Sequence, residues 1–560
     1  MGISPGFGIA ASALSAFRVA AEVAGHNMTN VNTEGYSRQR AIFRTNLPQE
    51  FAFGPKGTGV NLATINRMRD SYLDRRLEQE NSEMGMWSMR EDILQQIELY
   101  FNETTEAGVS NLMAELFEGW QALASSPDDQ ATRVGLVQQA SLFTTTLNKK
   151  YEQIQEVRES LDVELQNEVD LINSISQEIA SLNTQIVSVE SGGHTANDMR
   201  DRRDTLVGEL SEIIDIQLYE QNDGSYSISY ENKNLVFAGM ATEMEVYLDD
   251  SHPQHLLGIR WEDTKQELSF DSGKLGGLFY VRDVSAAGYQ SKLDTLAQTI
   301  IEEVNRIHAS GQGIAMFTSV TGATTLDSIT DTLDSSAAGL DITPVAGSFD
   351  IIIDGDPGSP YTVNVDPSVE SLEDLRDNIN TVLAATDVSA SIVDNQLVFS
   401  TAGDEFAFSN DSSDILMSLG INTFFTGYGA SDIAVNPILE SNASYIAAAQ
   451  SSSPGDNTNA MAIAALRNAT TMQGNSETFE EFYNANIIGE LGTETSEATR
   501  LVANQQIIID QIQNSIDEVS SVSLDEEMTN LVQIQQATTA IARYISMLSD
   551  MLEDVVTILR

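Results

Sequence analysis

The sequence has no cysteine, which excludes disulfides and thiolate metal ligands. Stability must therefore come from packing within the chain or against neighbouring subunits. Positive charge is also scarce, because 29 Lys and Arg residues stand against 83 Asp and Glu residues, a formal net charge of −54. Such a surface repels nucleic-acid phosphates and anionic lipid headgroups, so we expect no nucleic-acid partner.

Long apolar runs are missing as well. No stretch has the roughly 18 to 20 uninterrupted apolar residues that a membrane-spanning helix needs, so no membrane insertion is predicted. The small apolar residues at 9–16 follow no basic segment and precede no convincing cleavage site, so we expect no cleaved signal peptide. At 560 residues the chain is too long for one core and is expected to form three or four domains.

Motifs that would anchor an enzyme or a cofactor are absent. The one G-x-S-x-G match, Gly2-Ile3-Ser4-Pro5-Gly6, follows no strand and so is no nucleophile elbow, and we expect neither catalysis nor a cofactor. The only close histidine pair is His252 and His255, which Pro253 places in a turn, and we expect no metal site there. Asp354 and Asp356 lie in a turn without the spacing of an EF-hand, and calcium binding near them is left open.

The C-terminal segment has the clearest period. Ser523, with Glu526 three residues later, has capping-box spacing and predicts a helix start. Apolar residues then occupy the a and d positions of one heptad frame, with Thr538 as the polar exception. These residues are Leu524, Leu531, Ile534, Ile541, Ile545, Leu548, Leu552, Val555 and Leu559. Such a stripe must be buried against another helix of this chain or of another copy.

The N-terminal segment is the natural partner for this helix. Apolar and small residues recur there at spacings of three and four, and the alanines permit close helix approach: Ala13, Phe17, Ala20, Ala24 and Val31. The two terminal helices could pair either antiparallel or parallel. Further helices are predicted over 68–123, over 136–190 with a stop at Ser191-Gly192-Gly193, and over 501–522.

The middle of the chain changes to β patterns. Residues 213–281 alternate with period two between turn signals, and residues 340–436 form a second β-rich region. One helix interrupts that region, opened by Ser371 and Asp374 at capping-box spacing. From Ile307 to Leu466 there are 21 acidic residues and a single basic one, Arg376, which is typical of an outward-facing, solvated domain.

These patterns predict an α+β multidomain fold. Residues 1–48 and 523–560 would form a discontinuous coiled-coil base of terminal helices. Residues 49–310 and 440–522 would form a helical bundle with a small β unit at about 213–281. Residues 311–439 would form an inserted, acidic, β-rich outer domain.

Both ends of the chain resemble one protein family. The segment from Asn27 to Gln39, NMTNVNTEGYSRQ, resembles the signature with which axial proteins of the bacterial flagellum leave their first helix. The segment from Val522 to Leu531, VSLDEEMTNL, and the Gln- and Ala-rich residues after it resemble the C-terminal helix of the hook-associated protein 1 family. Residues 196–204, ANDMRDRRD, are also similar to a segment of that family.

The resemblance implies a structural, non-enzymatic subunit at the junction between flagellar hook and filament. Its implied partners are other copies in a ring, the hook protein, a second junction protein (hook-associated protein 3), and a cytoplasmic chaperone on the C-terminal helix before type III export. The implied location is extracellular. The assembly interface would combine the heptad residues with residues at and after the first helix: Phe17, Asn27, Asn30, Val31, Asn32, Thr33, Gly35 and Tyr36.

Two other functions remain compatible with the sequence. A secreted coiled-coil scaffold or adhesin would also use heptad seams, but it leaves the paired terminal signatures unexplained. Another flagellar axial subunit, such as hook, rod or flagellin, would share the terminal helices.

Overall fold

The computed structural model describes residues 4–51, 54–101, 108–249, 256–356, 359–451, 453 and 455–558. Two expectations, on the histidine pair His252 and His255 and on Leu559, fall outside these residues. The chain divides into two compact units. Unit 1 comprises residues 1–92, 161–280 and 497–560, and unit 2 comprises residues 93–160 and 281–496. The multidomain α+β fold is confirmed, while the three-part domain division stays a prediction.

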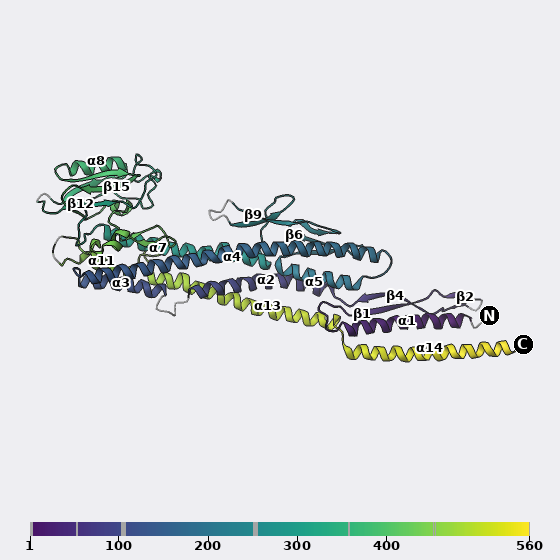
Figure 1. Ribbon diagram of the computed structural model, residues 1–560. Coiled ribbons are helices and arrows are strands. Elements are labelled where there is room, and N and C mark those ends of the chain that lie inside the picture. Colours follow the sequence, from purple (N-terminus) through teal and green to yellow (C-terminus); the bar gives the residue numbers. More distant parts are fainter. Residues whose placement is uncertain are drawn as a thin grey trace. The chain divides into compact units, whose positions relative to one another are not determined.

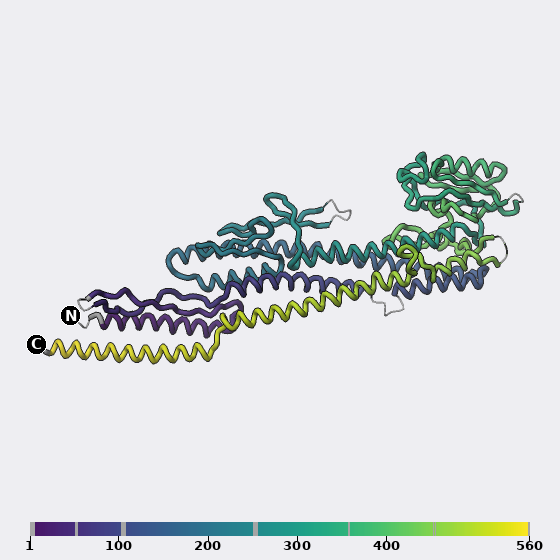
Figure 2. Tube along the Cα trace, turned by 180° about the vertical axis from the view of Figure 1, so that it is seen from behind, coloured from purple at the N-terminus to yellow at the C-terminus, as the bar shows by residue number. Residues whose placement is uncertain are grey.

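Unit 1 contains both terminal helices, α1 (Ser4–Thr29) and α14 (Leu524–Ile558). They lie side by side and antiparallel, so that the start of α1 lies beside the C-terminal half of α14 (Figures 1 and 2). Small residues permit this approach, since a Cβ atom on Gly6 would stand only 3.0 Å from Cδ1 of Leu548. A long helical base built from both ends of the chain is therefore confirmed.

Helix α1 is long and apolar enough, over Gly6–Thr29, to cross a membrane by length and composition, with a mean hydropathy of 1.4. The sequence-based expectation of no such segment counted uninterrupted apolar residues, and α1 is interrupted by Arg18, Glu22 and several serines. A helix that packs against another helix meets the same criterion, so composition alone assigns no membrane here.

A β region follows α1 in unit 1. Strand β1 (Gln39–Thr45) pairs antiparallel with β4 (Val60–Arg67), and β2 (Gln49–Phe51) pairs with β3 (Gly54–Lys56). The helix predicted over 68–123 is wrong in one respect, because α2 ends at Tyr100 and a separate α3 begins at Val109. The sequence did carry a signal of this break, because residues 102–108 (NETTEAG) contain no large apolar side chain and end in Gly108.

The small β unit lies against the C-terminal half of α4 (Gln130–Glu190), which ends just before the predicted Ser-Gly-Gly stop. The Asn183 amide on α4 donates to the carbonyls of Tyr226 and Ala238 and so ties the sheet to the helix. The remaining elements of this part are α5 (Asn197–Ile213), β5 (Gln217–Glu220), β6 (Tyr226–Tyr230), β7 (Lys233–Phe237), β8 (Met240–Ala241), β9 (Met244–Leu248), β10 (Leu257–Trp261) and α6 (Gly273–Tyr280).

Unit 2 contains a helical part and a β-rich insert. The helical part comprises α3 (Val109–Ser125), a π-helical turn (Val281–Ala286), α7 (Ala287–Ala309), α11 (Thr458–Ala465), α12 (Phe479–Phe482) and a second π-helical turn (Tyr483–Gly489). Helix α13 (Glu490–Ser520) begins here and ends shortly before α14.

The insert is built on two three-stranded sheets, β11-β15-β14 and β13-β12-β16, with α8 (Leu372–Val382) beside them (Figure 1). The predicted capping box at Ser371 and Asp374 is confirmed, with both reciprocal bonds present. The strands are β11 (Ser319–Thr321), β12 (Gly347–Ile353), β13 (Tyr361–Val365), β14 (Val388–Val393), β15 (Gln396–Thr401) and β16 (Phe406–Ser409). Their inward side chains, among them Phe349, Phe399 and Phe408, form a core of their own.

Shorter elements complete unit 2. They are a 3₁₀ turn (Ser336–Ala338), α9 (Ile415–Ser418), β17 (Phe425–Thr426), β18 (Ala434–Val435), α10 (Pro437–Ser441) and 3₁₀ turns at Ala443–Tyr445 and Leu466–Asn468. The turn carrying Asp354 and Asp356 is held by hydrogen bonds, since the Tyr361 hydroxyl donates to Asp356 Oδ2 at 2.8 Å. No group of three or more His, Asp or Glu residues within the described ranges is placed to hold a metal ion.

Candidate assembly interface

The segment from Asn27 to Gln39, here called the signature loop, begins with a buried asparagine. Asn27 is 1% exposed, and its side chain faces the first residue of β1. Asn27 Nδ2 donates to the Gln39 carbonyl and Asn27 Oδ1 accepts from the Gln39 N–H, both at 2.9 Å. This pair of bonds reproduces what a neighbouring strand would supply, so the asparagine fixes where the sheet starts relative to the helix.

Tyr36 closes the loop over this asparagine. Its hydroxyl donates to Asn27 Oδ1 at 2.8 Å and lies 3.1 Å from His26 Nδ1. Burial raises the pKa of Tyr36, and the carboxylates of Asp198, Asp201 and Glu527 raise it further. The phenol therefore stays neutral and acts as a donor at ordinary pH.

The residues between them finish the helix and face outward. Asn30 Nδ2 donates to the His26 carbonyl at 3.0 Å, and the Thr33 hydroxyl donates to Asn30 Oδ1 at 3.2 Å. Val31 is half-buried, whereas Asn32 and Thr33 are exposed. The loop thus separates into an inner set that builds the turn and an outer set available to a neighbour.

Gly35 is required at the tightest point of the loop. Its φ is +75°, a left-handed conformation that side chains disfavour. A Cβ atom there would also stand 2.4 Å from Thr205 Oγ1 on α5. Backbone conformation and space therefore both exclude larger residues.

Replacing Gly35 by alanine is expected to destabilise unit 1 by more than the left-handed backbone alone explains. Gly193→Ala is the matched control, because Gly193 has φ +81° and open space around its Cβ position. The control should lose about 1 kcal/mol of unfolding free energy, and Gly35→Ala about 2 kcal/mol or more, because the contact adds to the strain. Denaturant unfolding of the two variants measures this, and equal losses would contradict the role given to Thr205.

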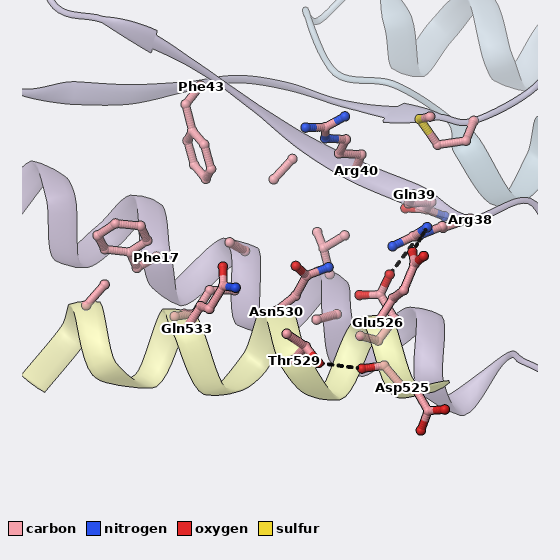
Figure 3. A pocket seen from close by; sticks show the side chains of 18 residues that line it. Phe17, Arg38, Gln39, Arg40, Phe43, Asp525, Glu526, Thr529, Asn530 and Gln533 are labelled. Atoms are coloured by element: carbon pink, nitrogen blue, oxygen red, sulfur yellow. Dashed lines mark hydrogen bonds and ion pairs between the residues drawn. The ribbon is translucent and has the colours of Figure 1, made fainter. Parts of the chain in front are cut away.

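The signature loop and the start of α14 bind each other through Arg38. Arg38 Nε donates to Glu527 Oε1 and a terminal nitrogen donates to Glu526 Oε2, each at 2.7 Å (Figure 3). The Arg38 N–H also donates to the Ser520 carbonyl at 2.9 Å. Burial alone would lower the pKa of Arg38, but its bond to Glu526 and the nearby Glu527 outweigh this and raise it. The two family-like motifs, more than 480 residues apart, are therefore one structural site.

A second set of carboxylates supports the loop from α5. Asp201 Oδ2 accepts from the Ser37 N–H at 3.2 Å, and Asp201 Oδ1 accepts from Arg67 at 2.6 Å. Asp198 accepts from the Gln39 side-chain amide at 2.9 Å. These aspartates were not among the interface residues predicted from the sequence. Residues 196–204 had been noted as similar to the family, and that similarity was the signal that could have identified them.

A groove of about 940 Å³ lies between α1, β1 and the first half of α14 (Figure 3). Phe17 on α1 meets Phe43 on β1 edge to face at 6.5 Å, and Ile534 and Ala537 line the α14 side. Arg38 and its two glutamate partners lie at one end. The groove is therefore lined by both apolar and polar side chains, among them Asn530 and Gln533, and carries the Arg38 ion pairs at one end.

The predicted heptad stripe on α14 is only partly covered by α1. Leu548 is buried, and Leu531, Ile534, Ile541 and Ile545 are half-buried. Leu524, Leu552 and Val555 remain more than 40% exposed. A further set of apolar side chains on α14 is exposed as well: Met528, Val532, Met547 and Met551. One partner helix is therefore too little to bury the apolar surface that α14 presents.

Comparison with known proteins finds relatives among flagellar hook-associated proteins. The family model described as the flagellar hook-associated protein FlgK helical domain matches residues 94–319. The model of the flagellar basal body rod FlgEFG protein C-terminal region matches residues 513–558, which include all of α14.

Whole-length relatives agree. Flagellar hook-associated protein 1 of Bacillus subtilis is 26% identical over 98% of this chain and 97% of the relative. Its namesake in Escherichia coli is 24% identical, covering 94% of each. The solved flagellar hook junction protein FlgK from Burkholderia pseudomallei has the same fold, with a TM-score of 0.55 and 18% identity over 80% of this chain and all of that one. With both terminal signatures joined in one site and relatives matched over nearly their whole length, the chain is similar throughout to flagellar hook-associated protein 1 and contains the helical domain described for it.

Proposed function

We propose that this protein is a structural subunit of the junction between flagellar hook and filament. The observation that carries this is the site where Arg38 joins the two terminal signatures, together with relatives that match over nearly the whole chain and are named hook-associated protein 1. The family is a structural component of the flagellum, which implies that the chain has no catalytic turnover.

The proposed assembly surface consists of α1, the outer residues of the signature loop and the apolar stripe of α14. The exposed leucines, valines and methionines of α14 support this, because a monomer gains nothing from leaving them in water. In the assembled state they would pack against other copies in a ring, the hook protein and the second junction protein. The acidic insert would face outward.

The proposal also includes the route by which the subunit leaves the cell. A subunit that works outside the cell without a cleaved signal peptide would leave through the flagellar type III channel. A cytoplasmic chaperone would cover the exposed stripe of α14 until then, since an uncovered amphipathic helix invites aggregation.

The first test is a deletion strain viewed by electron microscopy. Hooks without filaments, with flagellin lost to the medium, are expected. Normal filaments would instead favour the adhesin or scaffold reading, which predicts a protein whose loss leaves the flagellum intact.

The second test introduces charge into the α14 stripe. The double change Leu548→Asp and Leu552→Asp should abolish complementation of the deletion strain, because it places two carboxylates on the apolar face. Val163→Asp, at a 65% exposed position on α4, is the matched control and should swim normally. Motility of the double variant equal to that of the control would contradict the proposed surface.

A further inference from the structure

A buried histidine sits where the insert joins unit 2. His308, near the end of α7, is fully buried between the rings of Trp120 and Phe424, at ring-centroid distances of 6.2 and 5.5 Å. The chain enters the insert just after His308 and returns through segments 422–425 and 443–449. We call the end of α7 and these two segments the root of the insert.

The two ring nitrogens of His308 bind the two returning segments. Nδ1 lies 2.7 Å from the Asn422 carbonyl, which can only accept, so Nδ1 carries the proton. Nε2 accepts from the Ala447 N–H at 2.9 Å, so Nε2 carries none. The neutral tautomer is therefore fixed by its partners, and a second proton on Nε2 would face a donor.

No described carboxylate compensates such a proton. Segments 422–425 and 443–449 and helix α11 contain no charged residue. From α4, the buried Arg133 donates to the Ile446 carbonyl at 2.7 Å and adds positive charge nearby. On α7 itself, Arg306 is paired with Glu303 and Asp414. Burial lowers the pKa of His308 to about 4, with Arg133 acting in the same direction against the Asn422 bond.

The rest of the root depends on the same returning segments. Asn422 Nδ2 donates to the carbonyls of His308, Ala309 and Gly311, and Asn459 Nδ2 donates to the Ala447 carbonyl. The insert has an apolar core of its own, in which only Ala309 and Tyr445 belong to the root, and residues 311–439 contain no histidine. Loss of the His308 bonds would therefore loosen the root and leave the insert folded.

We propose that His308 is an acid-sensitive latch: in its neutral form it ties both returning segments to α7, and its protonation releases the root while the insert stays intact. The sign follows from linkage. A histidine that must be neutral in the native state binds fewer protons there than in the opened state, so the closed root is favoured above about pH 6.5 and loses stability as the pH falls toward 4.

Amide hydrogen exchange on the full chain tests the latch, at pH 7 and pH 4.5 and corrected for intrinsic exchange rates. Peptides covering 422–425 and 443–449 should open roughly 50-fold more often at pH 4.5, from the shift of the His308 pKa. Peptides from β12 and β15 should be unchanged. Unchanged root exchange, or opening of the root and the insert together, would overturn the proposal.

His308→Gln is the matched variant, because its amide can donate to Asn422 and accept from Ala447 without titrating. Its root should exchange alike at both pH values. The same acceleration as in the wild type would assign the effect to other groups and overturn the role of His308. If the variant does not fold, nitrogen NMR of the wild-type imidazole decides instead: a ring titrating near pH 6.5 would refute the latch.

Discussion

Replacing Arg38 by alanine should detach the start of α14 from the signature loop. The two glutamates that Arg38 binds differ in burial, since the side chain of Glu527 is 5% exposed and that of Glu526 is 63% exposed. Removing the guanidinium leaves the Glu527 carboxylate buried without a cation, a loss of about 3 kcal/mol. Unfolding of unit 1 by denaturant should report that loss, and protease cleavage at 521–523 should increase.

The two glutamates provide the internal control for this prediction. Glu526→Gln removes an exposed partner and should change stability by less than about 1 kcal/mol. Glu527→Gln leaves the arginine with only its exposed partner and should lie between that variant and Arg38→Ala. If Glu526→Gln proved as damaging as Arg38→Ala, burial would not be what makes the contact strong.

Replacing Asn27 by leucine should be at least as severe. The change leaves the N–H and the carbonyl of Gln39 without partners in a buried place and removes the acceptor of the Tyr36 hydroxyl. Each unsatisfied buried group costs about 1–3 kcal/mol, so the total is of the order of 3–6 kcal/mol. We expect loss of the cooperative unfolding transition of unit 1 and no complementation of a deletion strain.

Two further variants, Asn27→Asp and Asn30→Ala, should lose less stability than Asn27→Leu. The aspartate keeps the acceptor for Gln39 and Tyr36 but loses the donor and adds a charge near Asp198 and Asp201, so its loss should be intermediate and smaller in acid. The side chain of Asn30 makes only local bonds, to the His26 carbonyl and with the exposed Thr33 hydroxyl, and Asn30→Ala should cost well under 1 kcal/mol. A leucine variant no worse than Asn30→Ala would show that Asn27 does not set the start of β1.

Local chemistry made much of the fold predictable from sequence. The heptad stripe identified α14 and the capping box at Ser371 identified α8, because both depend on residues three or four positions apart. The break between α2 and α3 was missed, although residues 102–108 (NETTEAG) contain no large apolar side chain and end in Gly108. Ser523 accepts from the Glu526 N–H as predicted, but the Glu526 carboxylate turns to Arg38, which no local pattern could indicate.

The individual residues of the site could be predicted from the sequence, but the contacts between distant segments could not. Asn27, Gly35 and Tyr36 were singled out, and the structure gives each a role in the turn. The bonds of Arg38 to Glu526 and of Ser37 to Asp201 span distances in sequence at which one chain, read alone, carries no pairing information. The apolar residues of α14 differ from these contacts. The sequence correctly places them on one face of the helix, but within a single chain only part of that face is buried.

The composition of unit 1 from three separate stretches of chain has a consequence for the order of folding. Unit 2 has all of its residues once position 496 is available, whereas the contacts of Arg38 wait for residues 526 and 527. A chain that emerges from its N-terminus therefore holds Arg38 and α1 without their partners on α14 for nearly its whole length. The end that appears first is among the last to be completed, and the subunit becomes competent for assembly only when its final helix arrives.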